Sequence, residues 1–169
     1  MTDSLPPADV LAISDLKARY FQYLDGKMWD RLHELYTPDA RFEGYAFNDA
    51  ASPEVFIETV SAFLTGVRSQ HQGYMPRFAG TAGTIRGLWA MHDYLTWEPG
   101  SRVYKGIDTP GMYGLRGYGY YEEEYTLTED GWRISFSRLV RTRIDPLVGV
   151  PPQALPYEVM DPDPDWLAG

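Results

Sequence analysis

The segment AISDLKARYFQYLDGKMWDRLHELYTPDARFEGY, residues 12–45, begins with a helical pattern and ends with a strand-like one. Its first apolar residues recur at intervals of three and four, which predicts an amphipathic helix over residues 8–24. Gly26 is the expected C-cap of this helix. A second short helix is predicted over residues 29–36, because Pro38 disfavours helical geometry in the residue before it.

The residues that follow predict one further helix and then a sheet. Ser52, followed by a proline and an acid, is typical of a helix N-cap and predicts a third helix running to Leu64. Beyond Gln70 the apolar period changes to two, and the segment 98–116, rich in glycine, is expected to be a long loop. Helices that precede a mostly antiparallel sheet predict an α+β domain. The expected strands cover residues 40–47, 70–80, 84–97, 117–127 and 132–144.

Composition and charge limit the class of protein. The 169 residues, 44% of them hydrophobic, are enough for one domain with an apolar core. We expect this domain at residues 1–146 and a proline-rich C-terminal arm at 147–169. A formal net charge of −9 argues against nucleic acid or an anionic membrane as a partner. There is no cysteine, and the opening residues MTDSLPPADV lack the pattern of a secretory signal, so a cytoplasmic location is expected.

The predicted strand 132–144 carries a charge on an otherwise apolar face. Strict alternation places Arg138 on the same face as Trp132, Ile134 and Phe136. Because an unpaired buried charge is costly, Arg138 should meet an acid or line a wet cavity. The alternative is an arginine that reaches solvent past a bulge or the strand end.

Tyrosines and glutamates are concentrated in GYGYYEEEYTL, residues 117–127. Alternation places Tyr121, Glu123 and Tyr125 on one face of the predicted strand. A surface of this kind suits an aromatic ligand, since a phenol has a flat apolar body and a polar tip. It equally suits a subunit interface, which is enriched in tyrosine for the same reason.

The three histidines are His33, His71 and His92. A single histidine is more often structural than catalytic, and each has that alternative. No pair of histidines has the helical spacing of metal ligands, so no metal site is predicted.

The quoted segment, followed by SQHQ (69–72) and EDGWRISFSRL (129–139), resembles the SnoaL-like branch of the nuclear transport factor 2-like superfamily. The resemblance covers roughly residues 11–144. It implies a curved sheet wrapped around three N-terminal helices, forming a cone whose open end holds a ligand. Members with activity include scytalone dehydratase, bile-acid dehydratase and other cofactor-independent lyases.

The resemblance also implies the site. Its members pair an aspartate at the end of the first helix with a histidine early in the sheet, and Asp25 and His71 occupy these positions. Tyr20 matches a pocket tyrosine, Tyr45 lies near a second, and His92 is similar to a further pocket histidine. We therefore expect the catalytic residues to be Asp25, His71 and Tyr20, and the substrate-binding residues to be Tyr45, His92, Arg138, Tyr121 and Glu123.

The resulting hypothesis is a lyase without cofactor that eliminates water or an aldehyde from a hydroxylated aromatic or polycyclic small molecule. Its expected assembly is a homo-oligomer, a dimer or trimer. Other classes stay open: an isomerase with Asp93 or Asp25 as the base, a non-catalytic ligand-binding protein, or a small oxygenase subunit.

Overall fold

The computed structural model describes residues 5–81, 83–152, 163 and 165–168. Within these residues the chain forms three α-helices, one short 3-10 helix and five strands, and the predicted α+β class is confirmed. In chain order the elements are α1 (Pro7–Asp25), α2 (Trp29–His33), β1 (Tyr36–Glu43), α3 (Pro53–Leu64), β2 (Arg68–Thr81), β3 (Thr84–Thr96), β4 (Met112–Thr128), β5 (Gly131–Val148) and the short 3-10 helix η1 (Trp166–Ala168).

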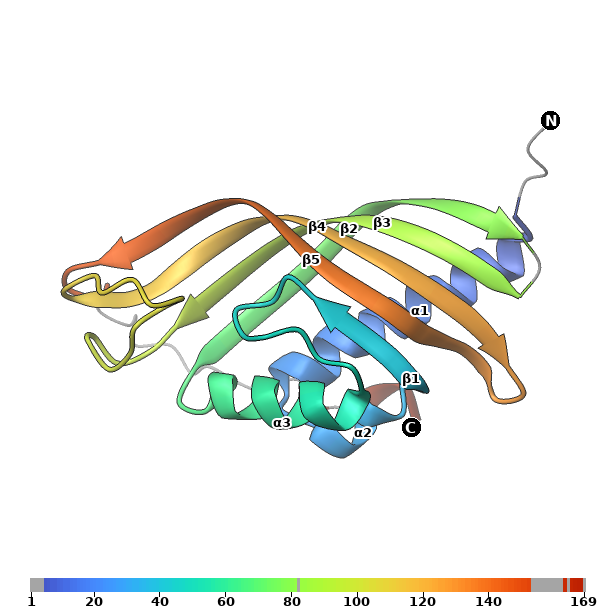
Figure 1. The fold of residues 1–169 in the computed structure, drawn as a ribbon, viewed down its shortest axis with the longest axis horizontal. Helices are drawn as coiled ribbons and strands as arrows, with labels where there is room; N and C mark the ends of the chain where they lie inside the picture. The colour runs from blue at the N-terminus through green and yellow to red at the C-terminus, as the bar shows by residue number, and fades with distance from the viewer. Residues whose placement is uncertain (1–4, 82, 153–162, 164, 169) are drawn as a thin grey trace.

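The strands form one curved, unclosed sheet in the order β1-β5-β4-β3-β2 (Figure 1). Every neighbouring pair is antiparallel except β1 and β5, which are parallel. The three helices lie on one side of this sheet, and α1 runs beneath its long strands (Figure 1). The sheet therefore has an inner face that packs against the helices and an outer face that they leave uncovered.

Several predicted boundaries need correction. The second helix ends at His33, and the residues that follow, Pro38 included, belong to β1. A proline is tolerated there because β1 is an edge strand: the N–H that proline lacks is not needed for a hydrogen bond to a neighbouring strand when it would point away from the sheet. Gly26 is the C-cap, but its φ of −75° is right-handed, and the left-handed residue is Lys27 with φ +58°. The loop predicted at 98–116 is shorter, because β4 begins at Met112.

The core lies between α1, α3 and the inner face of the sheet. The residues of α1 predicted to face inward are buried, namely Ile13, Leu16, Tyr20 and Leu24. Phe42 of β1 stacks on Phe56 of α3 with ring centroids 4.0 Å apart, and both rings are buried. Ser52 caps α3 as predicted, since its side chain accepts a hydrogen bond from the backbone N–H of Val55.

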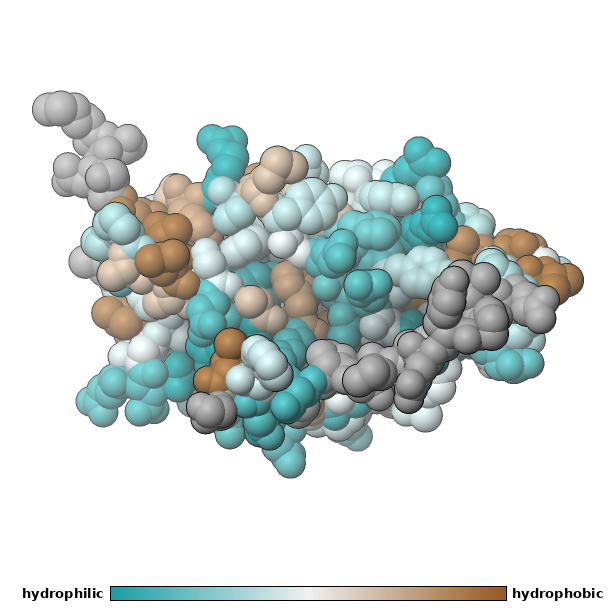
Figure 2. All heavy atoms as spheres, turned by 180° about the vertical axis from the view of Figure 1, so that it is seen from behind, coloured by the Kyte–Doolittle hydropathy of each residue, from teal (hydrophilic) through white to brown (hydrophobic). Residues whose placement is uncertain are grey.

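The surface gives no sign of a membrane span: none of the described helices is both long and apolar enough to cross a bilayer. Viewed from behind, hydrophilic residues cover much of the molecule, and hydrophobic residues form smaller patches among them (Figure 2). Residues 153–162, 164 and 169 of the predicted C-terminal arm lie outside the described part of the chain. Near its end, Asp165 pairs with Arg31 of α2 at 2.7 Å.

The stacked pair of phenylalanines gives a test of the core. Phe56→Ala should lower the free energy of unfolding by about 3–5 kcal/mol, because it leaves a cavity beneath β1. Urea denaturation measures the change. Val55→Ala, one residue away and 49% exposed, is the matched control and should change stability by less than ~0.5 kcal/mol. Equal losses in the two variants would contradict the placement of α3.

Candidate active site

Asp25 and His71 lie in direct contact between the end of α1 and the beginning of β2. The Nδ1 atom of His71 lies 2.7 Å from Oδ1 of Asp25. The backbone N–H of His71 donates a second hydrogen bond of 2.7 Å to Oδ2 of the same carboxylate. Both oxygens of Asp25 are thus bound to one residue of the sheet, which fixes the carboxylate and the imidazole relative to each other.

The local chain direction explains why Asp25 reaches the sheet. It is the last residue of α1, and Lys27, in the left-handed conformation, turns the chain back immediately afterwards. The negative end of the helix dipole disfavours an acid here, by about 0.3–1 kcal/mol for exposed groups. The nearby ammonium of Lys27, which donates a 2.7 Å hydrogen bond to Ser69, opposes this effect. Burial lowers the pKa of Lys27 from its ordinary value, and Asp25 partly offsets that shift.

The contact determines the form of the imidazole. Because a carboxylate only accepts hydrogen bonds, Nδ1 of a neutral His71 carries the hydrogen, and Nε2 is left with a free lone pair. No described residue makes a hydrogen bond to Nε2. The side chain of His71 is 9% exposed, so this nitrogen is a sheltered base.

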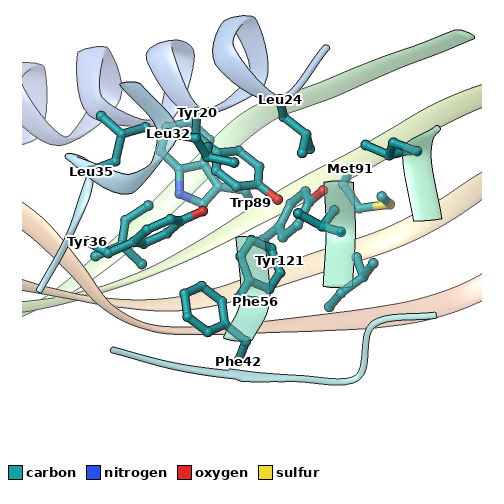
Figure 3. Close-up of a cluster of buried hydrophobic side chains, with 14 of the residues drawn as sticks. Tyr20, Leu24, Leu32, Leu35, Tyr36, Phe42, Phe56, Trp89, Met91 and Tyr121 are labelled. Atoms are coloured by element: carbon teal, nitrogen blue, oxygen red, sulfur yellow. The ribbon is translucent and has the colours of Figure 1, made fainter. Parts of the chain in front are cut away.

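Several tyrosine side chains are buried in the interior of the domain. The rings of Tyr20, Tyr36 and Tyr121 lie in the core between the helices and the sheet (Figure 3). The buried hydroxyls of Tyr20, Tyr36 and Tyr104 have no hydrogen-bond partner among the described residues. Burial raises the pKa of Tyr20 well above its ordinary value, and the neighbouring Tyr121 and Tyr45 raise it further. These hydroxyls therefore stay protonated and can donate to an oxygen of a ligand.

Glu123 is the centre of a buried hydrogen-bond network. Lys17 of α1 donates to its Oε1 at 2.6 Å, and Ser137 of β5 donates to the same oxygen at 2.9 Å. Tyr125 donates to Oε2. The hydroxyl of Tyr45 lies 2.9 Å from Ser137, and since Ser137 gives its hydrogen to Glu123, Tyr45 must be the donor there. The network thus holds the hydrogen of Tyr45 away from a ligand.

Lys17 has no counterpart among the residues singled out from the sequence. It is 1% exposed, and its ammonium lies 3.6 Å from the ring centroid of Tyr121 and 4.1 Å from that of Tyr20. Burial lowers the pKa of Lys17 from 10.5 to about 8, although the charge of Glu123 opposes the shift. A signal existed: Lys17 falls four residues after Ile13 and three before Tyr20, within the buried stripe of α1.

A second buried ion pair joins β3 and β5. Asp93 is fully buried, and its two oxygens accept hydrogen bonds from Nη1 and Nη2 of Arg141 at 3.0 and 2.5 Å. Hydrogen bonding to Asp93 and its charge raise the pKa of Arg141, although burial opposes the shift most strongly. Asp93 was considered from the sequence only as a base for an isomerase, and Arg141 was missed.

Arg138 meets an acid, as predicted, but it lies on the opposite face of the sheet from the predicted one. Its side chain is 48% exposed on the outer face, where it pairs with Glu122 at 2.5 Å and lies 3.7 Å from Glu43. The cause is a β-bulge: Tyr125 pairs with Ile134 and Glu124 with Phe136, which leaves Ser135 without a partner and reverses the alternation. The inner face of β5 after the bulge carries Ser137, Leu139 and Arg141, so the interior guanidinium belongs to Arg141.

His92, expected among the substrate-binding residues, lies on the other face of the sheet from His71. It lies on the outer face of β3 and stacks on Tyr118 with ring centroids 5.0 Å apart, on the opposite side of the sheet from His71. The inner-face neighbour is Asp93. The structure therefore places six of the expected site residues on the inner side, and it places Arg138 and His92 on the outer face. The six are Asp25, His71, Tyr20, Tyr45, Tyr121 and Glu123.

Two open grooves lie outside this interior. One, of about 590 Å³, follows the outer face of the sheet and is lined by charged residues including Arg41, Glu122 and Arg138. The other, of about 470 Å³, lies between Trp29, the end of α3 and Arg68. Within the described ranges, no group of three or more histidine, aspartate or glutamate side chains is arranged to hold a metal ion.

Comparison with known proteins agrees with this architecture. A family profile described as a SnoaL-like domain matches residues 7–138. The structure of a type 2 hexachlorocyclohexane dehydrochlorinase (LinA) is similar, with a TM-score of 0.71 and 19% identity over 87% of this chain and 96% of that one. A candidate scytalone dehydratase from Novosphingobium aromaticivorans DSM 12444 has a TM-score of 0.69 and 13% identity, over 90% and 96% of the two chains. At such identities the likeness establishes the fold.

The buried pair of Lys17 and Glu123 gives a prediction about stability. Lys17→Met should cost about 3–5 kcal/mol of unfolding free energy, because it leaves the carboxylate of Glu123 buried without a cation. Adding Glu123→Gln should recover most of that loss. Arg19→Met, which breaks an exposed pair with Asp15 on the same helix, should cost less than ~1 kcal/mol. A loss from Arg19→Met as large as that from Lys17→Met would refute the buried pair.

The buried tyrosines predict the response to alkali. Burial raises the pKa values of Tyr20, Tyr36, Tyr121 and Tyr125 well above 10 in the folded state. Their contribution to stability is complete below pH 10 and is lost as the pH rises above it, because only the unfolded chain then releases these protons. Tyrosinate absorbance and circular dichroism followed together should show the last tyrosines ionising only as the protein unfolds. Ionisation of all 13 tyrosines in the folded protein would contradict the prediction.

Proposed function

The chain belongs to the SnoaL-like domain family, as the sequence resemblance predicted, and from this premise we propose that it is a cofactor-independent lyase. Its proposed substrate is a hydroxylated aromatic or polycyclic small molecule. The observation that carries the proposal is the contact between Asp25 and His71, which presents one imidazole nitrogen as a base in a sheltered place.

In the proposed mechanism, Nε2 of His71 takes a proton from the substrate. The carboxylate of Asp25 holds the Nδ1–H tautomer and stabilises the imidazolium that forms. The unpartnered hydroxyl of Tyr20 donates a hydrogen bond to the substrate oxygen on which negative charge develops. The ring of Tyr121, whose centroid lies 5.9 Å from that of Tyr20, forms an aromatic side of the proposed substrate site.

Two eliminations use this arrangement. In a dehydration, His71 removes a proton from carbon, the electrons form a double bond, and the hydroxyl leaves as water after receiving the proton back. In an aldehyde elimination, His71 removes the proton of a hydroxyl, the adjacent carbon–carbon bond breaks, and the carbanion fragment is protonated by the imidazolium. Both reactions return His71 to its neutral form without a redox partner. General acid–base catalysis of this kind typically contributes about 10²–10⁴-fold.

The names of the similar structures support elimination chemistry, since one is a dehydrochlorinase and another a candidate dehydratase. The isomerase alternative with Asp93 as the base has less support. Both oxygens of Asp93 accept hydrogen bonds from Arg141, so neither oxygen is free to take a proton from a substrate.

The proposal also covers the binding partners of the protein and its location in the cell. The substrate is a small molecule, the location is the cytoplasm, and the chain assembles with copies of itself. The uncovered outer face of the sheet, with the partly exposed rings of Tyr118, Tyr120 and Phe136, supports an assembly of this kind.

The proposal predicts loss of turnover when either member of the dyad is removed. A panel of hydroxylated aromatic compounds is incubated with the protein, and mass spectrometry detects loss of water or formaldehyde. On any compound that is turned over, Asp25→Asn and His71→Ala should each lower kcat by about 10²–10⁴-fold, because the base is misoriented or absent.

His33→Ala is the matched control, because His33 is an exposed histidine that lies 3.0 Å from Glu54. It should retain wild-type turnover. Near wild-type rates in His71→Ala or Asp25→Asn would exclude the dyad as the catalytic unit, whatever the reaction.

A further inference from the structure

His71 has a second carboxylate beside it. In the antiparallel pairing of β2 and β3, His71 lies directly opposite Asp93, and both side chains are on the inner face. Side chains directly opposite in such a pair have Cβ atoms about 4.5–5.5 Å apart. The inner-face neighbour of His71 on β3 is therefore Asp93, while the ring of His71 contacts Asp25 of α1.

Two uncompensated carboxylates would favour the protonated form of His71, which is unable to accept a proton from a substrate. Each negative charge favours the protonated imidazolium, so a histidine between two of them keeps its proton to higher pH. A protonated Nε2 has no lone pair with which to take a proton from a substrate. The proposed lyase needs one carboxylate to orient the ring, and a second free charge would work against it.

Arg141 cancels this second charge. Its guanidinium crosses from β5 over β4 and binds both oxygens of Asp93, so the pair that faces His71 is neutral overall. The other charged and titratable groups around this corner of the interior are Lys27 at the end of α1, Tyr104 and Lys105 from the loop before β4, and Tyr20 and Tyr121. Burial lowers the pKa of both lysines; the charge of Asp25 opposes this shift at Lys27, whereas the like charge of Arg141 adds to it at Lys105.

A glycine in the middle of β4 makes the crossing feasible. Gly117 pairs with Asp93 on β3. A Cβ atom at this position would lie 1.8 Å from Nη1 of Arg141 and 2.2 Å from Oδ1 of Asp93. Glycine weakens a strand interior, and it often marks a place where another group approaches the backbone closely. The space it leaves here is filled by the ion pair.

We propose that Arg141 is a positioning residue that neutralises Asp93, so that His71 remains an unprotonated base although two acids flank it. The role of Arg141 in catalysis rests on the proposed function. Its effect on the proton affinity of His71 does not. That affinity is measured without turnover. A failure of the inference can therefore be told apart from a failure of the lyase proposal.

The test is an NMR pH titration of the His71 ring, assigned by comparison with His71→Ala among only three histidines. Arg141→Met removes the cation that neutralises Asp93 and should raise the pKa of His71 by about one unit or more, a tenfold increase in proton affinity. Asp93→Asn leaves the guanidinium without its partner and should lower the pKa. The double variant removes both charges. The pKa of His71 should therefore return to within about 0.3 units of the wild-type value.

Arg138→Met is the matched control, since it removes an arginine of the same strand from its pair with Glu122 on the outer face. It should leave the pKa of His71 unchanged. If Arg141→Met does not fold, Asp93→Asn and the double variant decide the question. Shifts of the two single variants in the same direction, no shift in Asp93→Asn, or a double variant that fails to return toward wild type would overturn the proposal.

Discussion

The two hydrogen bonds from His71 to Asp25 join the end of the first helix to an edge strand of the sheet, and the chemistry of the interior depends on them. Hydrogen bonds to charged groups contribute about 1.5–3 kcal/mol each. They outweigh the small penalty of an acid at a helix C-terminus, so Asp25 is held against the sheet. Because one carboxylate binds both the backbone and the ring of His71, the orientation of the ring follows from the fold itself.

Around this contact the interior combines aromatic surface with paired charges. Lys17 pairs with Glu123, and Arg141 pairs with Asp93. Each pair spans two elements that are distant in sequence, and each is costly to break because removal of one partner leaves a buried charge. Asp25 is the acid left to act on His71. The buried hydroxyls of Tyr20 and Tyr104, which lack described partners, add hydrogen-bond donors that suit an oxygen-bearing ligand.

Much of this arrangement could be predicted from sequence, and what was missed has identifiable physical causes. Three features depend only on residues that are close in sequence, so one sequence was enough to predict them. They are the periodicity of α1, the N-cap at Ser52 and the alternation on β4 that buries Tyr121 and Glu123. Alternation failed on β5, because the bulge at Ser135 exchanged the faces of Arg138 and Arg141, and bulges depend on pairing with another strand. Lys17 was overlooked although its spacing put it in the buried stripe of α1. Gly117 gave no such signal, because the predicted strand begins at this residue and only the structure places it inside β4.

The central claim, that Asp25 holds His71 as a base with Nε2 free, is tested most directly by the tautomer of its imidazole ring. Nitrogen-15 NMR of the neutral ring distinguishes the two nitrogens by their chemical shifts. The account predicts a protonated Nδ1, with its proton shifted downfield by the hydrogen bond to Asp25, and an unprotonated Nε2. A neutral His71 with its hydrogen on Nε2, unchanged in Asp25→Asn, would contradict it.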